Sequence, residues 1–174
     1  MQSLIRVGII GGGENSAVGK VHLTALRMDT RFEIGPCFFS HLEEENKKSH
    51  FLYSLPWKEH PSNIDYWLKS NEHLLDLVIL LTPSTQHANQ IQKIINNRIS
   101  FVTEKPVGCS LNEINDICNH LENHKNINAR FIHNYSGYPM YREMVLRLNK
   151  KEIGRIHHVK AQMPSDGFAR EMIT

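Results

Sequence analysis

Two opposite charges and a proline follow an apolar, strand-like run, where Glu104, Lys105 and Pro106 come directly after "ISFVT". A turn needs neither charge, and a solvated ion pair stabilises a protein by only roughly 0 to 1 kcal/mol. Lysine, in contrast, can accept or donate a proton during a reaction. An example is the proton that an alcohol loses when a hydride leaves its carbon. We therefore expect a chemical role for Lys105; the alternative is a lysine that only pairs with a surface carboxylate.

A glycine-rich stretch, "VGIIGGGENSAVGKVH", joins the first strand-like run to the first helical pattern. Gly11 permits a tight turn there, Gly13 lets the backbone approach a pyrophosphate, and the helix start offers free N–H groups to that anion. The third glycine position of a dinucleotide fingerprint falls on Ser16, so we predict a longer loop in which Ser16 bonds a phosphate. Val18, at the helix start, belongs to the same predicted cofactor site. A plain glycine-rich turn is the alternative.

The second strand-like run ends in "PCFFSHLEEE". In NAD-binding folds an acidic residue near this point binds the adenine ribose. This chain has Ser40 and His41 there, and we interpret Glu43, Glu44 and Glu45 as a solvated helix face. Serine can bond either a ribose hydroxyl or a 2′-phosphate, and no arginine is adjacent. The choice between NAD and NADP therefore stays open at this point.

The elements that must position these residues alternate between apolar runs and helical patterns. The apolar runs cover 4–10, 32–39, 75–81, 99–103 and 127–133. They are mostly continuous, as in parallel strands buried on both faces. Helical spacing connects three sets of residues, each a candidate packing face: Val18, Val21, Ala25 and Met28; Ala88, Ile91, Ile94 and Ile95; and Ile114, Ile117, Cys118 and Leu121. This alternation predicts an α/β fold with a doubly wound parallel sheet, the Rossmann dinucleotide-binding fold.

Two regions are less regular. We interpret 51–72 as a loop or a short additional strand followed by a helix from about Ile64 to Ser70. After Asn134 we predict a helix that stops at Gly154 and then a strand over 155–163. The predicted organisation is therefore a dinucleotide-binding domain over 1–135 and, over 136–174, a linking helix and the first strand of an α+β second domain that ends early.

Composition excludes several other classes of protein. The 174 residues are 40% hydrophobic and 22% charged, with a formal net charge of +2, which gives no electrostatic case for a nucleic-acid partner. No apolar stretch approaches the ~20 residues needed to span a bilayer. The eleven histidines are scattered, so we predict no metal site. The three cysteines form no CxxC pair, which favours reduced thiols and a cytoplasmic protein.

The motifs together resemble the Gfo/Idh/MocA family of NAD(P)-dependent oxidoreductases, named for glucose–fructose oxidoreductase and inositol dehydrogenase. The similar stretches are "VGIIGGG", "VGKVHLTALRMDTRFEI", "LLTPSTQHANQIQKII", "FVTEKPVGCSLNE" and "HNYSGYPMYREM". They cover nearly the whole chain in the family's order. The Glu-Lys-Pro triplet before a Ser-x-x-Glu helix start is the most specific of them.

The resemblance implies roles for the residues at the strand ends. Lys105 would contact the substrate hydroxyl that is oxidised, Glu104 would help to position the nicotinamide ribose, and Pro106 would follow a cis bond. Thr82 and Pro83, with His87 on the next helix, would lie against the ribose and pyrophosphate of the cofactor. A place on the helix surface is the alternative for His87.

At the end of the last strand-like run, the resemblance implies that Asn134 faces the nicotinamide and substrate. The family's second domain supplies the substrate-binding sheet and further catalytic groups. We therefore expect an NAD(P)-binding protein whose ancestral chemistry is hydride transfer at a sugar or polyol hydroxyl, weak or inactive as this chain. The alternative is a non-catalytic nucleotide-binding module. We also expect a homo-oligomer, formed by pairing of the 155–163 strand with a second copy; the alternative is that this strand frays.

Overall fold

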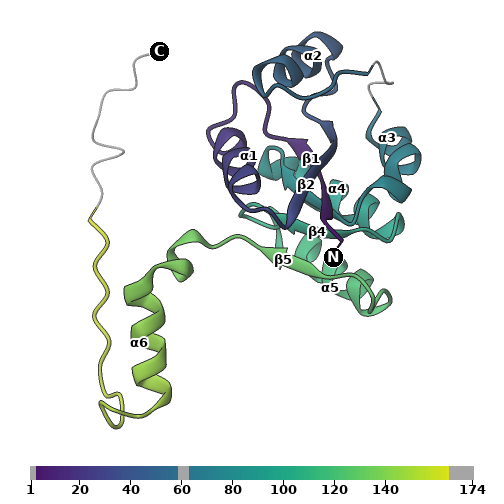
Figure 1. The fold of residues 1–174 in the computed structure, drawn as a ribbon. Helices are drawn as coiled ribbons and strands as arrows, with labels where there is room; N and C mark the ends of the chain where they lie inside the picture. Colours follow the sequence, from purple (N-terminus) through teal and green to yellow (C-terminus); the bar gives the residue numbers. More distant parts are fainter. Residues whose placement is uncertain (1–2, 59–62, 165–174) are drawn as a thin grey trace. The chain divides into compact units, whose positions relative to one another are not determined.

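The computed structural model describes residues 3–58 and 63–164. Its core is one parallel sheet of five strands in the order β2-β1-β3-β4-β5 (Figure 1). The strands are β1 (Ile5–Gly11), β2 (Phe32–Phe38), β3 (Leu77–Leu81), β4 (Ser100–Thr103) and β5 (Ala129–Phe131). The predicted Rossmann-like α/β fold is thereby confirmed. In the described part of 51–72 no additional strand forms, and 59–62 lie outside the described residues.

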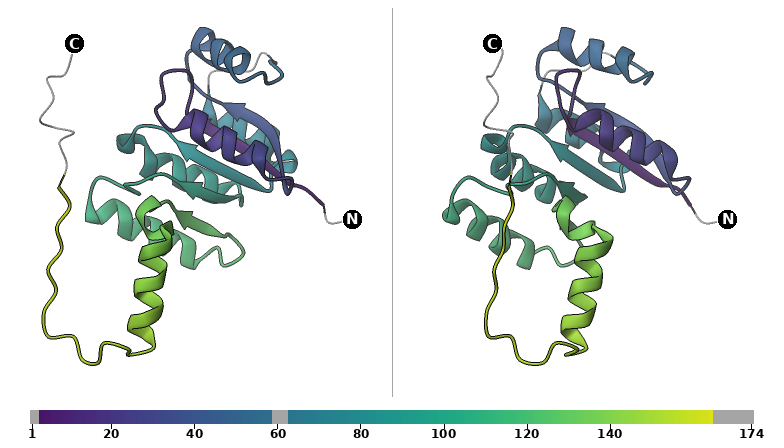
Figure 2. Two further views of the ribbon diagram at one scale, coloured as in Figure 1. Left: turned by 60° about the vertical axis from the view of Figure 1, so that its left-hand side comes forward. Right: turned by 90° about the vertical axis from the view of Figure 1, so that its left-hand side faces the viewer.

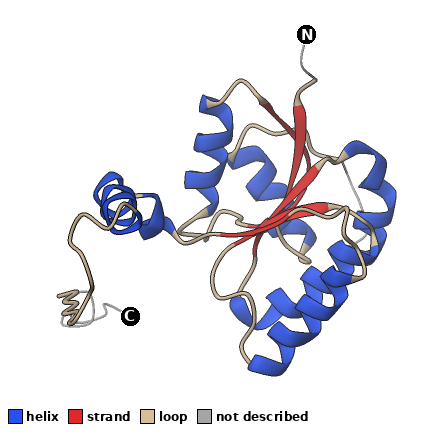
Figure 3. Cartoon of the chain, turned by 90° about the horizontal axis from the view of Figure 1, so that it is seen from below, coloured by secondary structure: helices blue, strands red, loops and turns tan. Residues whose placement is uncertain are grey.

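Helices connect the strands and cover both faces of the sheet (Figure 3). They are α1 (Gly19–Met28), α2 (Glu43–Leu52), α3 (Ile64–Asn71), α4 (Ser84–Asn96) and α5 (Leu111–Glu122), with a short 3₁₀ helix η1 (Glu72–Leu74) before β3. Figure 2 shows α1 across one face of the strands. Because every strand pair is parallel, all carboxyl ends lie at one edge of the sheet, where ligands bind in such folds.

The core has two layers because neighbouring residues of a strand point to opposite faces. Val78 and Leu80 of β3 pack with α3, α4 and α5, while Ile79 and Leu81 pack with Leu23 of α1. The predicted packing face of α4 is fully buried, over Ala88, Ile91, Ile94 and Ile95. A strand that is buried on both sides cannot tolerate alternation with polar residues, which explains the continuous apolar runs.

The predicted packing face of α1 is wrong. Val21 and Met28 are 65% and 81% exposed, and the helix instead buries Leu23 and Leu26. Gly19 lies on the same buried face and packs against the backbone of Gly12 at the start of the helix. Two faces of α1 carry apolar residues at helical spacing, so spacing alone did not show which of them is buried.

A capping interaction fixes the start of α5 beside the Glu-Lys-Pro segment. The hydroxyl of Ser110 accepts a hydrogen bond from the Glu113 amide, as the Ser-x-x-Glu pattern predicts. The Glu113 carboxylate in turn accepts from the amide of Cys109, one residue before the cap. Two backbone donors at the helix start are thus satisfied, and the chain after Pro106 is held in place.

The residues divide into two compact units, Met1–His133 and Asn134–Thr174. The second contains η2 (Asn134–Gly137) and α6 (Pro139–Asn149). The predicted stop at Gly154 is wrong, because α6 ends before Lys151, which adopts a positive φ of 57° and closes the last turn. The predicted strand over 155–163 is also wrong. That segment is exposed and has no strand partner among the described residues.

Residues 165–174 of the predicted second domain lie outside the described residues, and the domain boundaries stay a prediction. So does the homo-oligomer, although the strand expected to pair does not form. No helix in the described part of the chain is long and apolar enough to cross a membrane. Among the same residues, no group of three or more His, Cys, Asp or Glu side chains could hold a metal ion.

Candidate cofactor site

A pocket of about 630 Å³ lies at the carboxyl ends of β1, β2 and β3, where the strand order reverses direction. This is the position at which open α/β sheets bind ligands, and the volume is within the roughly 300–1,000 Å³ of small-molecule sites. Six predicted cofactor residues line it: Gly11, Gly13, Ser16, Ser40, Thr82 and Pro83. The pocket therefore brings together residues from three separate loops.

The glycine loop needs its glycines for two different reasons. Gly11 and Gly12 have φ angles of 77° and 73°, a backbone conformation that side chains disfavour. Gly19 is required by contact, because a Cβ atom there would lie 1.8 Å from the carbonyl oxygen of Gly12. Gly19 thus performs the close helix–strand packing of the third fingerprint glycine, which the fixed spacing of the motif did not assign to it.

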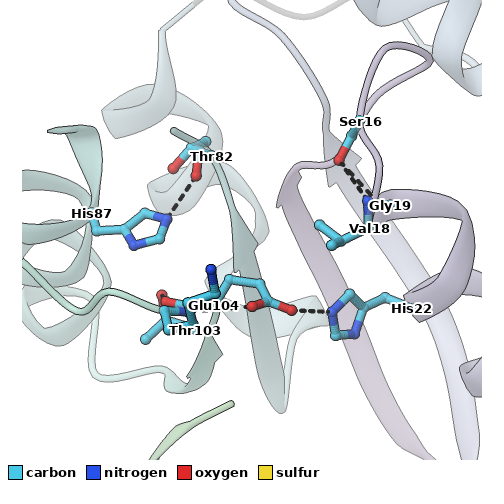
Figure 4. A network of polar contacts seen from close by, with 9 residues as sticks. Ser16, Val18, Gly19, His22, Thr82, His87, Thr103 and Glu104 are labelled. Atoms are coloured by element: carbon cyan, nitrogen blue, oxygen red, sulfur yellow. Dashed lines mark hydrogen bonds and ion pairs between the residues drawn. The ribbon is translucent and has the colours of Figure 1, made fainter. Parts of the chain in front are cut away.

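Ser16 organises the loop as well as lining the pocket. Its hydroxyl oxygen accepts hydrogen bonds from the amides of Val18 and Gly19, at 3.3 and 3.2 Å (Figure 4). Two of the N–H groups at the start of α1 are therefore satisfied within the chain. The hydroxyl proton remains a donor that could reach a phosphate. Val18 does not line the pocket; it packs against the core on the α1 side.

Helix α2 and Tyr53, the residue after it, make contacts that the sequence analysis missed. Ser49 lines the pocket, and its hydroxyl accepts from the amide of Glu14 at 3.1 Å. Tyr53 donates its hydroxyl to the carbonyl oxygens of Gly12 and Gly13, at 3.0 and 3.1 Å. Burial, and secondarily the nearby Glu14 carboxylate, raise the pKa of Tyr53. The available signal was polar residues at helical spacing in α2.

A carboxylate from α2 lies close to the end of β2. Glu45, one turn into α2, lines the pocket, and its Oε2 accepts a hydrogen bond of 2.7 Å from the Ser40 hydroxyl. Glu43, Glu44 and Glu45 are all exposed, as predicted, and Glu45 in addition lines the pocket. Spacing alone did not reveal this, because the chain between Ser40 and Glu45 turns back and brings the carboxylate over the strand end.

Glu104 lies at the end of β4 and contacts α1. Its Oε1 is 3.0 Å from Nε2 of His22, and each side chain is 18% exposed (Figure 4). The other carboxylate oxygen accepts from the amide of Lys105 at 3.3 Å. The Lys105–Pro106 bond is cis, as predicted, and the Lys105 side chain is exposed. His22, like Ser49 and Tyr53, is thus a residue that the sequence analysis missed.

His87 is buried and links two loops of the site. Its Nε2 lies 2.7 Å from the carbonyl oxygen of Thr82, and its Nδ1 lies 2.6 Å from that of Pro106 (Figure 4 shows the first contact). It lies neither on the helix surface nor in the pocket lining. The ring instead ties the end of β3 to the Glu-Lys-Pro segment.

Glu104 and Lys105 are not among the pocket-lining residues, although the end of β4 adjoins the end of β3 in the sheet. Asn134 lies in η2, within the second unit. A cofactor contact by these three residues stays a prediction.

Solved structures share this fold. An oxidoreductase from Sinorhizobium meliloti superposes with a TM-score of 0.80 at 24% identity, over 88% of this chain and 43% of that chain. An inositol dehydrogenase homologue from Azotobacter vinelandii, complexed with NAD⁺, superposes with a TM-score of 0.80 at 18% identity, over 88% of this chain and 40% of that chain. The scyllo-inositol dehydrogenase from Lactobacillus casei, with bound NAD(H) and scyllo-inositol, has a TM-score of 0.74 at 20% identity, over 87% of this chain and 43% of that chain.

The chain spans less than half the length of these solved structures, and at such identities the likeness establishes the fold. No curated protein matches the sequence. Residues 5–131, more than half of the chain, match the family GFO_IDH_MocA, described as "Oxidoreductase family, NAD-binding Rossmann fold". This match confirms the resemblance seen in the motifs. The chain therefore belongs to the Gfo/Idh/MocA oxidoreductase family, whose NAD-binding Rossmann fold it forms over residues 5–131.

Proposed function

We propose that this chain is the cofactor-binding part of an NAD-dependent oxidoreductase that removes a hydride from a hydroxyl-bearing carbon of a sugar-like polyol. The observation that carries the proposal is the pocket at the strand-order reversal, with the glycine loop on one side and the end of β3 on the other. Solved relatives with bound inositols support a cyclic polyol as the substrate class.

The pocket residues fit a dinucleotide. The glycine loop lines the pocket with backbone, and the loop leads into the start of α1, whose dipole favours an anion such as pyrophosphate. The pocket extends to Ser40 and Glu45 at the end of β2, where an adenine ribose would place its hydroxyls. When bound, NAD would supply the hydride acceptor.

The charges around the pocket favour NAD over NADP. Glu14 and Glu45 are acidic, and the described lining residues include no lysine or arginine. A 2′-phosphate near Glu45 would therefore meet like charge and no bidentate cation, whereas ribose hydroxyls can donate to that carboxylate. NADP should bind more weakly than NAD for this reason.

Lys105 is the proposed catalytic residue. As a hydride leaves the substrate carbon, the hydroxyl proton moves to Lys105 in its amine form, and a carbonyl group results. The loop that contains Lys105 is held by His87, which contacts the Pro106 carbonyl oxygen, and by Glu104, which accepts from the Lys105 amide. The described part of the second unit contains no sheet that could enclose a substrate, so we expect cofactor binding with little turnover from residues 1–174.

Calorimetric titration tests the proposal. We expect NAD to bind at least tenfold more tightly than NADP, and Glu45→Gln to reduce that ratio. Glu43→Gln is the matched control, because Glu43 is an exposed glutamate of the same helix that does not line the pocket. Turnover with inositols, sugars and other polyols is then measured. Absence of NAD binding contradicts the proposal, whereas binding without turnover in any longer form of the protein would favour a non-catalytic nucleotide-binding module.

In a form that turns over, Lys105→Ala should lower kcat much more than NAD affinity, because the proposed contact is made in the transition state. Lys125→Ala, far along the sequence at the opposite ends of the strands, is the control. An equal loss of NAD affinity would instead identify Lys105 as a residue that fixes the cofactor.

A further inference from the structure

Helix α2 buries polar side chains where an ordinary surface helix buries apolar ones. Its buried residues are Asn46, Ser49 and His50. With Tyr53, just beyond the end of the helix, they recur at positions i, i+3, i+4 and i+7, which is one helical face. Buried polar groups cost free energy unless they are hydrogen-bonded, so this face requires specific partners.

Three of these four residues find their partners in the backbone of the cofactor pocket. The Asn46 side-chain oxygen accepts from the amide of Phe39 at 2.9 Å, which fixes the end of β2. Ser49 and Tyr53 bind the glycine loop. Because side chains from one helix satisfy backbone groups of both β1 and β2 loops, α2 connects the two halves of the pocket.

Tyr53 is itself held from several sides. Its ring centroid lies 5.3 Å from that of Phe39, and its backbone carbonyl oxygen accepts a hydrogen bond from the Arg27 guanidinium of α1. Its hydroxyl meets the carbonyl oxygens of both Gly12 and Gly13. Because the C=O and N–H of a trans peptide point in opposite directions, fixing the Gly12 carbonyl also fixes the direction of the Gly13 amide.

Ser49 fixes the next group along the loop. Its hydroxyl accepts from the Glu14 amide and donates to the Glu45 carbonyl oxygen at 2.8 Å. It also occupies the space beside Gly13, where a Cβ atom would come within 2.6 Å of the Ser49 Oγ. The carbonyl groups of Gly12 and Gly13 and the amide of Glu14 thus all have a partner on α2 or at Tyr53, the residue after it.

We propose that α2 is a positioning element for the glycine loop, in which Tyr53 and Ser49 hold Gly12–Glu14 in the conformation that receives the cofactor pyrophosphate. This inference rests on the proposed function of the pocket. A glycine-rich loop has many accessible conformations, and apparent affinity falls in proportion to the fraction of molecules in the binding conformation. Tyr53 and Ser49 increase that fraction without contacting the reacting atoms.

The neutral hydroxyl of Tyr53 is the form that this geometry needs, since it must donate to two carbonyl oxygens. Burial and the Glu14 carboxylate raise the pKa of Tyr53 and so keep the proton in place over the neutral and mildly alkaline range.

Tyr53→Phe tests the inference because it removes one hydroxyl and keeps the ring that packs on Phe39. Tyr66→Phe is the matched control, since Tyr66 is an exposed tyrosine on α3. Affinities for NAD and ADP are measured by calorimetry and for adenosine, which has no phosphate, by NMR titration. For Tyr53→Phe we expect dissociation constants about five- to tenfold higher for NAD and ADP, with an unchanged value for adenosine. Ser49→Ala should show the same pattern.

Amide hydrogen exchange in the ligand-free protein gives a readout that does not depend on binding. In Tyr53→Phe, the amide of Glu14, which donates to the Ser49 hydroxyl, and the amide of Ser16, which donates to the Gly13 carbonyl oxygen, should exchange at least about fivefold faster, while Tyr66→Phe leaves them unchanged. Unchanged exchange in Tyr53→Phe overturns the inference, and so does an equal loss of affinity for adenosine. If wild-type protein fails to bind NAD, the proposed function fails, and the exchange result still decides the role of α2.

Discussion

The carboxylate of Glu104 lies 3.0 Å from Nε2 of His22, which joins the end of β4 to the first helix after the glycine loop. Both side chains are largely buried, at 18% exposure. The same carboxylate holds the amide of Lys105. The proposed catalytic loop is therefore braced against the helix that follows the proposed phosphate loop.

His22→Ala should lower the free energy of unfolding by about 1 to 3 kcal/mol, because it leaves a part-buried carboxylate without its side-chain partner. Urea denaturation followed by circular dichroism measures the change. His73→Ala is the control, since the side chain of His73 is exposed on η1. Equal unfolding midpoints for the two variants would show that the His22–Glu104 contact does not stabilise the fold.

Gly13→Ala should weaken NAD binding through Ser49. A Cβ atom on Gly13 would meet the Ser49 Oγ at 2.6 Å, while its next contacts are at 3.4 Å or beyond. In a Ser49→Ala background the space is open, so Gly13→Ala should cost less there than in the wild-type chain, with a coupling of about 0.5 kcal/mol or more. Calorimetry on the four proteins gives this coupling; strictly additive costs would refute the steric relationship.

Gly19→Ala should destabilise the fold by about 3 kcal/mol or prevent folding, because its Cβ would overlap the Gly12 carbonyl, a backbone group that cannot rotate away. Gly137→Ala is the matched control, because nothing lies within 4 Å of a Cβ at that position. Thermal unfolding compares the two variants. Similar melting temperatures would mean that α1 can shift its start at little cost.

The free energy of unfolding should fall in acid partly because of Asp76. This residue directly precedes β3, and its carboxylate accepts hydrogen bonds from Arg6 of β1. The hydrogen bond from the Arg6 side chain lowers the pKa of Asp76 below its ordinary value of 3.8. The unfolded chain therefore binds this proton more tightly than the folded protein, and the contribution is lost as pH falls below about 4. The difference in unfolding free energy between wild type and Asp76→Asn should shrink between about pH 5 and pH 2. A difference that is constant with pH contradicts this.

Much of the fold followed from the sequence because it depends on local patterns. The five apolar runs gave all five strands to within a few residues, and the buried face of α4 followed from its periodicity. The Ser110–Glu113 cap followed from residue types at a fixed spacing. Such features depend on neighbours in the chain, so the sequence displays them directly.

The errors arose where contacts between distant residues decide the outcome. Spacing alone did not show which of the two apolar faces of α1 is buried, and the buried side of α2 depends on hydrogen bonds to loop backbone. The predicted strand over 155–163 had strand-like residues but no partner in the described part of the chain. A strand exists only through its neighbours, so residue preference could not establish it.

The site shows the same division. Residue types indicated Gly11, and the resemblance to the family implied Thr82 and Glu104; all three lie at the carboxyl ends of parallel strands, which meet at one edge of the sheet. Their supporting residues, His22 and Tyr53, come from helices and reach the site only through tertiary packing. No short motif could have assigned them.

The most direct test of the central claim is an NMR titration of the chain, labelled with ¹⁵N, with NAD. We predict saturable shifts of the backbone amides of Gly12, Gly13 and Ser16 and of Ser40 at the end of β2, all of which line the pocket. The amides of Asn123–Asn126, at the opposite ends of the strands, should not move. Shifts confined to that opposite edge, or no shifts at millimolar NAD, would contradict the assignment of this pocket as the NAD site.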